Sequence, residues 1–150
     1  MGKRRRQGPK QPRVKVPLST DKHPRASPAA DVPDLISWRF SEMDLSSEWG
    51  CHNLTSEKLL EVREKLLHFE SQTWDQCAGT GSAGVAKRIP LDDFPTKTKR
   101  RFEDLGVDDA EALHEFRLSG PERVWGIRRG SVCYILWWDP KHEVFPTKRT

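Results

Sequence analysis

Three short apolar runs in succession, at residues 113–118, 123–127 and 132–138, constrain the fold more than any other feature of this chain. Each run has the length of a strand, and the second and third are rich in the β-branched and aromatic residues that strands favour. The links between them, SGPE at 119–122 and RRGS at 128–131, contain the Gly and Pro that are typical of turns. This spacing predicts a meander of three antiparallel strands.

A fourth strand is predicted upstream, at residues 36–41. Ile36, Trp38 and Phe40 alternate there with Ser and Arg, which is the pattern of a half-buried strand. A lone strand leaves its backbone groups unpaired, so we expect this one to join the sheet of the meander.

Two helices are predicted between that strand and the meander. Over residues 55–73 apolar side chains recur at helical spacing, and Thr55 suits the N-cap. Over residues 95–105 a basic helix is predicted, with Pro95 in its first turn and Gly106 at its end. The connection at residues 74–92 includes GTGSAG. The sequence leaves two alternatives for it, an insertion that covers the sheet or a plain loop.

The order strand, helix, helix, strand, strand, strand predicts an α+β domain over residues 34–150. We expect a small antiparallel sheet with both helices packed on one face. Trp38, Phe116, Ile135 and Trp137 are the candidate core residues.

The net charge of +4 comes from the N-terminal arm. Residues 1–33 hold nine basic and two acidic residues together with six prolines, so we expect a disordered, Pro-rich basic arm. Such an arm either holds nucleic acid weakly, serves as a solubilising tail, or reflects a start site assigned too far upstream. The remaining chain has 17 basic and 20 acidic residues and is slightly acidic.

Other sequence signals point to a cytoplasmic protein. No apolar run reaches the length of a membrane span, and no apolar stretch follows the N-terminal basic residues as in a secretory signal. The three cysteines, at positions 51, 77 and 133, show neither a disulfide framework nor a zinc-binding spacing. We expect no metal site and no cofactor.

In the order of its elements the chain resembles the RelE/ParE superfamily of bacterial toxins. The resemblance in local sequence covers residues 113–146, where HEFRL leads into RVWGI, a turn, VCYILWW and then DPKH. It implies an endoribonuclease that cleaves mRNA, on or off the ribosome, through the 2′-OH of the RNA and without a metal. It also implies a protein antitoxin as partner and growth inhibition as the outcome.

The resemblance directs attention to the cationic and titratable residues of this region. A phosphorane needs cations to stabilise it and a group that moves protons, and a histidine titrates near neutral pH. The candidate catalytic residues are therefore Arg117, Arg128, His142 and Tyr134. The candidate RNA-binding residues, by charge or by stacking, are Arg123, Trp125, Arg129 and Lys141.

A second reading is a non-enzymatic protein of the same fold that binds another protein or a nucleic acid. The slight excess of acidic residues after residue 33 and the lack of an evident acid–base pair in the sequence favour this second reading. The cluster of Arg, Lys, His and Tyr favours the enzyme. The sequence does not identify the RNA target, the antitoxin or the oligomeric state.

Overall fold

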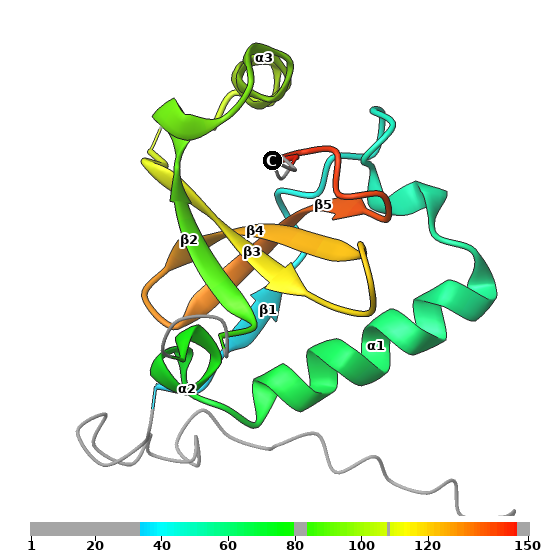
Figure 1. The fold of residues 1–150 in the computed structure, drawn as a ribbon, viewed down its shortest axis with the longest axis vertical. Coiled ribbons are helices and arrows are strands. Elements are labelled where there is room, and N and C mark those ends of the chain that lie inside the picture. The colour runs from blue at the N-terminus through cyan, green and yellow to red at the C-terminus, as the bar shows by residue number, and fades with distance from the viewer. Residues whose placement is uncertain (1–33, 80–83, 108, 147–150) are drawn as a thin grey trace, which may run out of the picture. The chain divides into compact units, whose positions relative to one another are not determined.

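The computed structural model describes residues 34–79, 84–107 and 109–146 and contains a five-stranded sheet in the order β1-β5-β4-β3-β2 (Figure 1). The strands are β1 (Ser37–Arg39), β2 (Ala86–Pro90), β3 (Ala112–Arg117), β4 (Arg123–Arg129) and β5 (Val132–Asp139). The predicted meander is confirmed as β3, β4 and β5. The expectation of a wholly antiparallel sheet is wrong, because β1 pairs with β5 in parallel and the sheet is mixed. The predicted arm at residues 1–33 lies outside the described residues.

The segment left open at 74–92 contains an edge strand. Ala86 and Ile89 of β2 are buried, and the strand pairs antiparallel with β3. Two basic residues and a terminal Pro in the sequence AKRIP obscured this strand, although both features are typical of sheet edges.

Helix α1 (Ser56–Glu70) begins where the sequence predicts. The Thr55 side chain accepts a hydrogen bond from the Lys58 backbone N–H at 3.2 Å, as an N-cap residue does. The helix ends earlier than predicted, and a short helix α2 (Trp74–Ala78) follows it. A capping box between Thr73 and Gln76 starts α2, because each side chain accepts a hydrogen bond from the other residue's backbone N–H.

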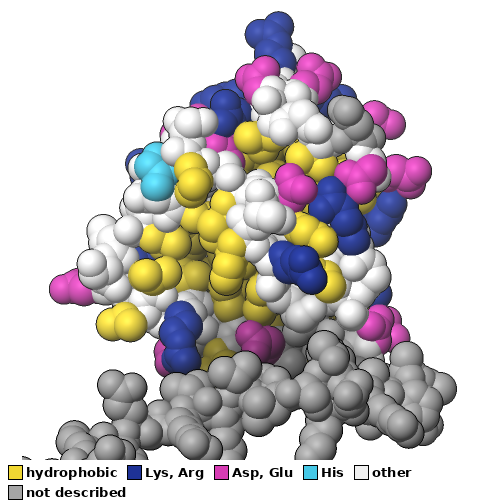
Figure 2. Space-filling model, turned by 180° about the vertical axis from the view of Figure 1, so that it is seen from behind, with side chains coloured by type: hydrophobic (Ala, Val, Ile, Leu, Met, Phe, Trp, Pro, Cys, Tyr) yellow, Lys and Arg dark blue, Asp and Glu magenta, His cyan; other side chains and the backbone are white. Residues whose placement is uncertain are grey.

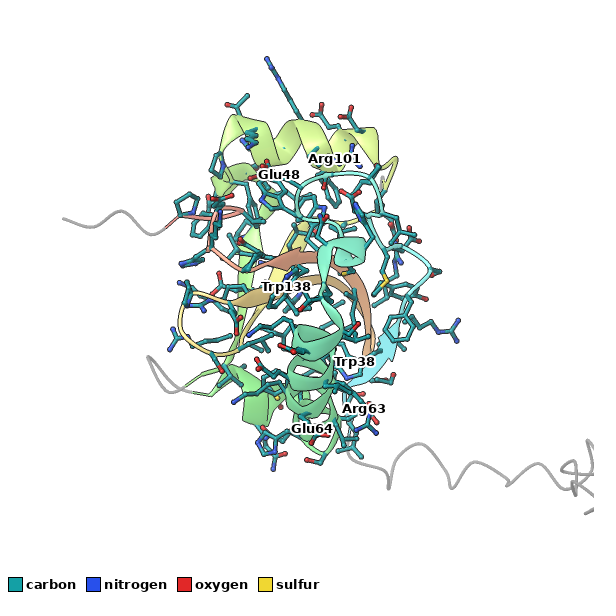
Figure 3. All side chains as sticks on the ribbon, turned by 90° about the vertical axis from the view of Figure 1, so that its right-hand side faces the viewer. Trp38, Glu48, Arg63, Glu64, Arg101 and Trp138 are labelled. Atoms are coloured by element: carbon teal, nitrogen blue, oxygen red, sulfur yellow. The ribbon has the colours of Figure 1, made fainter. Side chains whose placement is uncertain are left out.

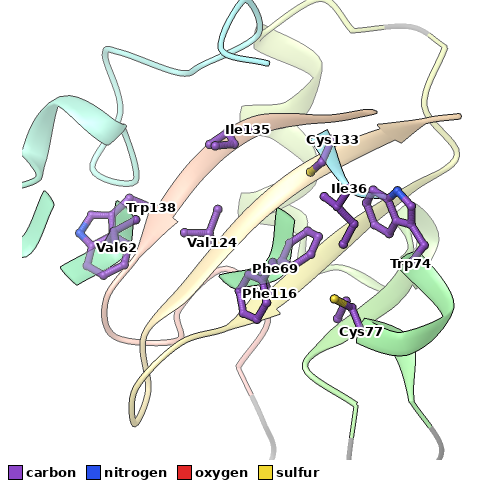
Figure 4. Close-up of a cluster of buried hydrophobic side chains, with 11 residues drawn as sticks. Ile36, Val62, Phe69, Trp74, Cys77, Phe116, Val124, Cys133, Ile135 and Trp138 are labelled. Carbon is purple, nitrogen blue, oxygen red and sulfur yellow. The ribbon is translucent and has the colours of Figure 1, made fainter. Parts of the chain in front are cut away.

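The first core lies between the sheet and the two helices α1 and α2 (Figure 4). Phe116 of β3 is its centre, and it contacts the rings of Trp38, Phe69 and Trp74 at centroid distances of 5.0–5.6 Å. The predicted core residues Phe116 and Ile135 therefore lie on this face, with Trp38 partly buried at its edge.

The second core lies on the opposite face of the sheet, beneath α3 (Thr96–Asp104), the loop before α1 and the C-terminal segment. Phe102 of α3, Trp49 of the loop and Val144 of the C-terminal segment pack here with Trp125 and Trp137. The prediction that both helices share one face is therefore wrong. Because β2 occupies the edge of the sheet, the chain that leaves it carries α3 to the other face (Figure 1).

One buried carboxylate ties the elements of this second face together. Asp44, 1 % exposed, receives two hydrogen bonds from the guanidinium of Arg101 at 2.7 and 2.8 Å and one from Trp137 Nε1 at 2.9 Å. It thereby joins the loop, α3 and β5. Figure 3 shows Arg101 on α3 at the end of the molecule away from Arg63 of α1.

Candidate active site

A cluster of polar side chains lies on the second face, at the end of the sheet where β5 finishes. Glu115 of β3 lies beside Lys87 of β2 on one side and Trp125 of β4 on the other. Strand alternation places Arg117 on the same face two residues on, opposite Arg123 of β4. Three strands thus bring charged side chains to one place.

Glu115 is the centre of this cluster. It is 7 % exposed, and its two carboxylate oxygens lie near two different basic side chains. Oε1 lies 3.4 Å from Arg123 Nε, and Oε2 lies 3.4 Å from His142 Nε2. Arg123 is itself buried, and its Nη1 donates to the backbone oxygens of Gly120 and Glu122 at 2.7 and 2.8 Å. The carboxylate is therefore held on one side by a fixed guanidinium.

His142 is brought to Glu115 by a tight turn at the end of β5. The buried carboxylate of Asp139 accepts hydrogen bonds from the backbone N–H groups of Glu143 and Val144 at 2.8 and 3.0 Å, and from Trp125 Nε1 at 3.2 Å. His142 has φ of 57°, in the left-handed region that non-glycine residues seldom adopt. Strain of this kind persists only where surrounding contacts enforce it, and Asp139 supplies them.

The cluster is open to solvent on the side of β2. Lys87 and Arg117 are exposed, and together with Glu115 they line a pocket of about 350 Å³ at this edge of the sheet. A substrate that reaches the buried carboxylate from this side would pass two cations. The pocket thus offers a proton acceptor beside positive charge, and the His142 imidazole contacts that acceptor without lining the pocket.

Three of the predicted site residues, Arg117, Arg123 and His142, meet here. Lys141 is adjacent to His142 in the chain and is exposed. Trp125 also lies here but is fully buried, and its indole N–H is donated to Asp139. The expectation that Trp125 stacks on a base is therefore wrong, because its ring offers no face to a ligand.

The other predicted residues lie at the opposite end of the sheet, beside the β4–β5 turn. The Arg128 guanidinium lies 4.5 Å from the ring centroid of Trp74, on the face covered by α1 and α2. The Arg129 guanidinium lies on the other face, 4.4 Å from the ring of Tyr134, and pairs with Asp109 at 2.8 Å. Arg128, Arg129 and Tyr134 are therefore not brought together with His142.

Glu115 and Asp139 are the residues that sequence reasoning missed. Glu115 lies two residues after Leu113 on the same face of β3, so it places a charge next to an apolar position. Asp139 directly precedes Pro140 at the end of β5, a position that favours a turn. Their partners come from separate elements, so neither role was visible from spacing alone.

A second feature is an apolar groove between α1 and the β1 edge of the sheet. The groove has a volume of about 380 Å³, and Figure 2 shows its apolar side chains as a continuous area at the surface. Trp38 and Trp138 lie on the sheet side, next to α1 (Figure 3). Phe40 and Leu67 on its rims are 61 % and 45 % exposed. Its further lining residues are Met43, Cys51, Leu54, Leu59, Val62, Arg63, Leu66, Glu70, Val124 and Ile135.

Comparison of the chain with known protein families, curated proteins and solved structures found no match. Within the described residues, no helix is long and apolar enough to cross a membrane. In the same residues, no group of three or more His, Cys, Asp and Glu side chains is placed to hold a metal ion.

Proposed function

We propose that the protein is a cytoplasmic, RelE-like endoribonuclease that cleaves mRNA through the 2′-OH of its substrate, without a metal. The observation that carries the proposal is the pair formed by Glu115 and His142, 3.4 Å apart, with the exposed cations of Arg117 and Lys87 at the same end of the sheet. A carboxylate and an imidazole in contact can exchange roles as proton acceptor and donor.

In the proposed reaction the RNA supplies its own nucleophile. Glu115 accepts the proton of a 2′-OH, and the 2′-oxygen attacks the adjacent phosphorus. The bond between phosphorus and the 5′-oxygen then breaks, and protonated His142 gives its proton to that oxygen. The products are a 2′,3′-cyclic phosphate and a 5′-hydroxyl end, and exchange with water restores both side chains.

The cations divide into two roles. Arg123 is buried against Glu115 and donates to two backbone oxygens, so it holds the carboxylate in place. Arg117 and Lys87 are exposed and are free to move toward a phosphate, where they would stabilise the charge of the phosphorane. Such cations also bind the backbone of single-stranded RNA without regard to sequence.

The test is controlled expression in bacteria combined with mapping of 5′-hydroxyl RNA ends. Expression of the wild-type chain should arrest growth and create new ends in mRNA. Glu115→Gln and the Arg117→Ala/His142→Ala double variant should abolish both effects while circular dichroism shows a folded domain. Lys65→Ala, a change of an exposed lysine on α1, is the matched control and should behave as wild type. Absence of new 5′-hydroxyl ends with the wild-type chain would refute the proposal.

The apolar groove supports a second candidate function, which is the binding of an amphipathic helix from a partner protein such as an antitoxin. One wall is the stripe of α1 that runs from Leu59 to Glu70, which spans about 16 Å at 1.5 Å per residue. Because apolar residues are exposed on both rims, the groove suits an elongated segment that covers them better than a small enclosed ligand.

A pair of leucines on α1 tests this second function. Leu67 lines the groove, whereas Leu60 is more exposed, at 66 %, and does not line it. A partner that binds the groove should be captured by wild type and by Leu60→Asp but lost with Leu67→Asp. Equal loss with both variants would indicate a surface effect and would exclude the groove.

A further inference from the structure

A second group of basic side chains lies on the opposite face of the sheet from Glu115, the face covered by α1 and α2. Arg88, His114 and Arg128 come from the neighbouring strands β2, β3 and β4. Arg88 lies opposite His114, and His114 lies opposite Gly126, two residues before Arg128. Residues that are opposite or diagonal neighbours on one face of a sheet lie close enough for long side chains to meet.

These three residues line a pocket of about 220 Å³. That volume is below the range of about 300–1,000 Å³ typical of sites for drug-sized ligands. The pocket therefore suits a small group, or one end of a larger molecule whose remainder stays in solvent.

The His114 ring fixes the polarity of this pocket. Its Nδ1 is buried and has no hydrogen-bond partner among the described residues. A buried N–H without a partner is rarer than a buried acceptor without one, so we place the ring proton on Nε2. Burial, with the positive charges of Arg128 and Arg88, lowers the pKa of His114 to about 4. At neutral pH the ring is therefore uncharged, and it offers a donor at Nε2.

We propose that Arg88, Arg128 and the Nε2–H of His114 form a binding site for a free phosphate ion or a terminal phosphate group. Two guanidinium groups and one imidazole supply donors from three strands, and arginine forks match the oxygens of phosphate. A terminal phosphate has a single point of attachment, which fits the small volume of the pocket. The site is separate from the proposed RNA cleavage centre and does not depend on it.

The neighbouring acidic groups leave room for this anion. Asp109 is paired with Arg129 through two hydrogen bonds at 2.8 and 2.9 Å, and Glu111 is exposed at the rim. The Asp34 carboxylate lies 3.6 Å from Arg128 but is 61 % exposed. An exposed pair of this kind adds little stability, so phosphate can replace Asp34 as the partner of Arg128.

The NMR signals of the His114 ring in the full chain report on the site directly. They are assigned by their absence from the spectrum of the His114→Gln variant. Inorganic phosphate should shift them in a saturable way and raise the pKa of His114 by about one unit, because a bound anion favours the imidazolium. Adenosine 5′-monophosphate should act in the same way if a terminal phosphate is accepted, and only inorganic phosphate should act if the site takes the free ion. Equal binding of an oligonucleotide that lacks terminal phosphates would overturn the assignment.

Variants on the rim complete the test. Arg88→Ala, a change of an exposed residue, should weaken phosphate binding about tenfold or more, and Asp34→Asn should strengthen it, whereas Lys65→Ala should leave it unchanged. A His114 signal that does not respond to phosphate, or an affinity that survives both Arg88→Ala and Arg128→Ala, would refute the proposal.

Discussion

Replacement of Asp44 with Asn tests the junction that holds α3 on the second face of the sheet. Asn has nearly the same shape but carries no charge, and one of its two terminal atoms is a donor. In the wild-type protein the carboxylate receives hydrogen bonds from Arg101, Trp137 and the backbone N–H groups of Ser46 and Ser47, at 2.7–3.1 Å. At least one of these donors would face the new amide N–H₂ group.

The expected loss of stability follows from the burial of the partners. Breaking a fully buried ion pair costs about 3–5 kcal/mol. The Arg101 side chain is 25 % exposed, so its charge can regain part of its hydration, and the lower part of that range applies. The fully buried Trp137 indole would add to the loss if its N–H were left without an acceptor. We therefore expect a loss of about 3 kcal/mol, which lowers Tm by roughly 12 °C at about 4 °C per kcal/mol.

Urea unfolding followed by tryptophan fluorescence measures this loss. Lys97→Ala is the matched control, because it removes an ion pair between Lys97 of α3 and Glu48, whose side chains are 70 % and 53 % exposed. Such a surface pair contributes less than about 1 kcal/mol. An Asp44→Asn protein as stable as the Lys97→Ala protein would refute the reasoning that the buried junction fastens α3.

The same carboxylate predicts the response to acid. Burial acts to raise the pKa of Asp44, but hydrogen bonds from Arg101, Ser47, Ser46 and Trp137 outweigh it and hold that pKa well below its usual value. A lowered folded-state pKa gives stability that is complete above the unfolded-state value of about 3.9 and is lost as the pH falls below it. Wild type should therefore lose more stability between pH 5 and pH 2 than Asp44→Asn, and parallel acid-unfolding curves would contradict this prediction.

Three further outcomes are expected. Gly126→Ala would place a Cβ 2.3 Å from Cys133 Sγ, beside the register shift between β4 and β5, so urea unfolding should show a loss of about 1–3 kcal/mol, and unchanged stability would contradict the packing. Burial raises the pKa of the Cys51 thiol to about 11 and that of Cys133 further, so alkylation of both should be slow at neutral pH in the folded protein and fast in urea. Asp139→Ala removes the acceptor of the Val144 N–H, so hydrogen exchange at that amide should accelerate, and retained protection would show that other contacts hold the turn.

The elements that the sequence predicts well are those defined by local pattern. The meander and α1 depend on alternation, helical spacing and a capping threonine, all of which lie within a few residues of one another. The position of α3 depends instead on β2, whose charges and Pro hid an edge strand. Once β2 is missed, nothing in the local sequence shows that the chain has crossed to the other face.

The same distinction holds for the site. Arg117, Arg123 and His142 could be proposed from residue type and position in the meander. Glu115 could not, because its significance depends on Arg123 from one strand and on a histidine that reaches it through the strained turn after β5. The burial of Trp125 was likewise invisible, since its indole partner Asp139 lies 14 residues away in the adjacent strand.

The parallel pairing of β1 with β5 affects how the chain folds during translation. Ser37 meets Val132 in the register of these strands, so residues roughly 95 positions apart must come together. At about 5–20 residues per second, β1 and the exposed leucines of α1 emerge from the ribosome several seconds before their sheet can form. During that interval the nascent chain displays the apolar side of α1 without its sheet, and we expect this stage to be the one at which chaperones bind it.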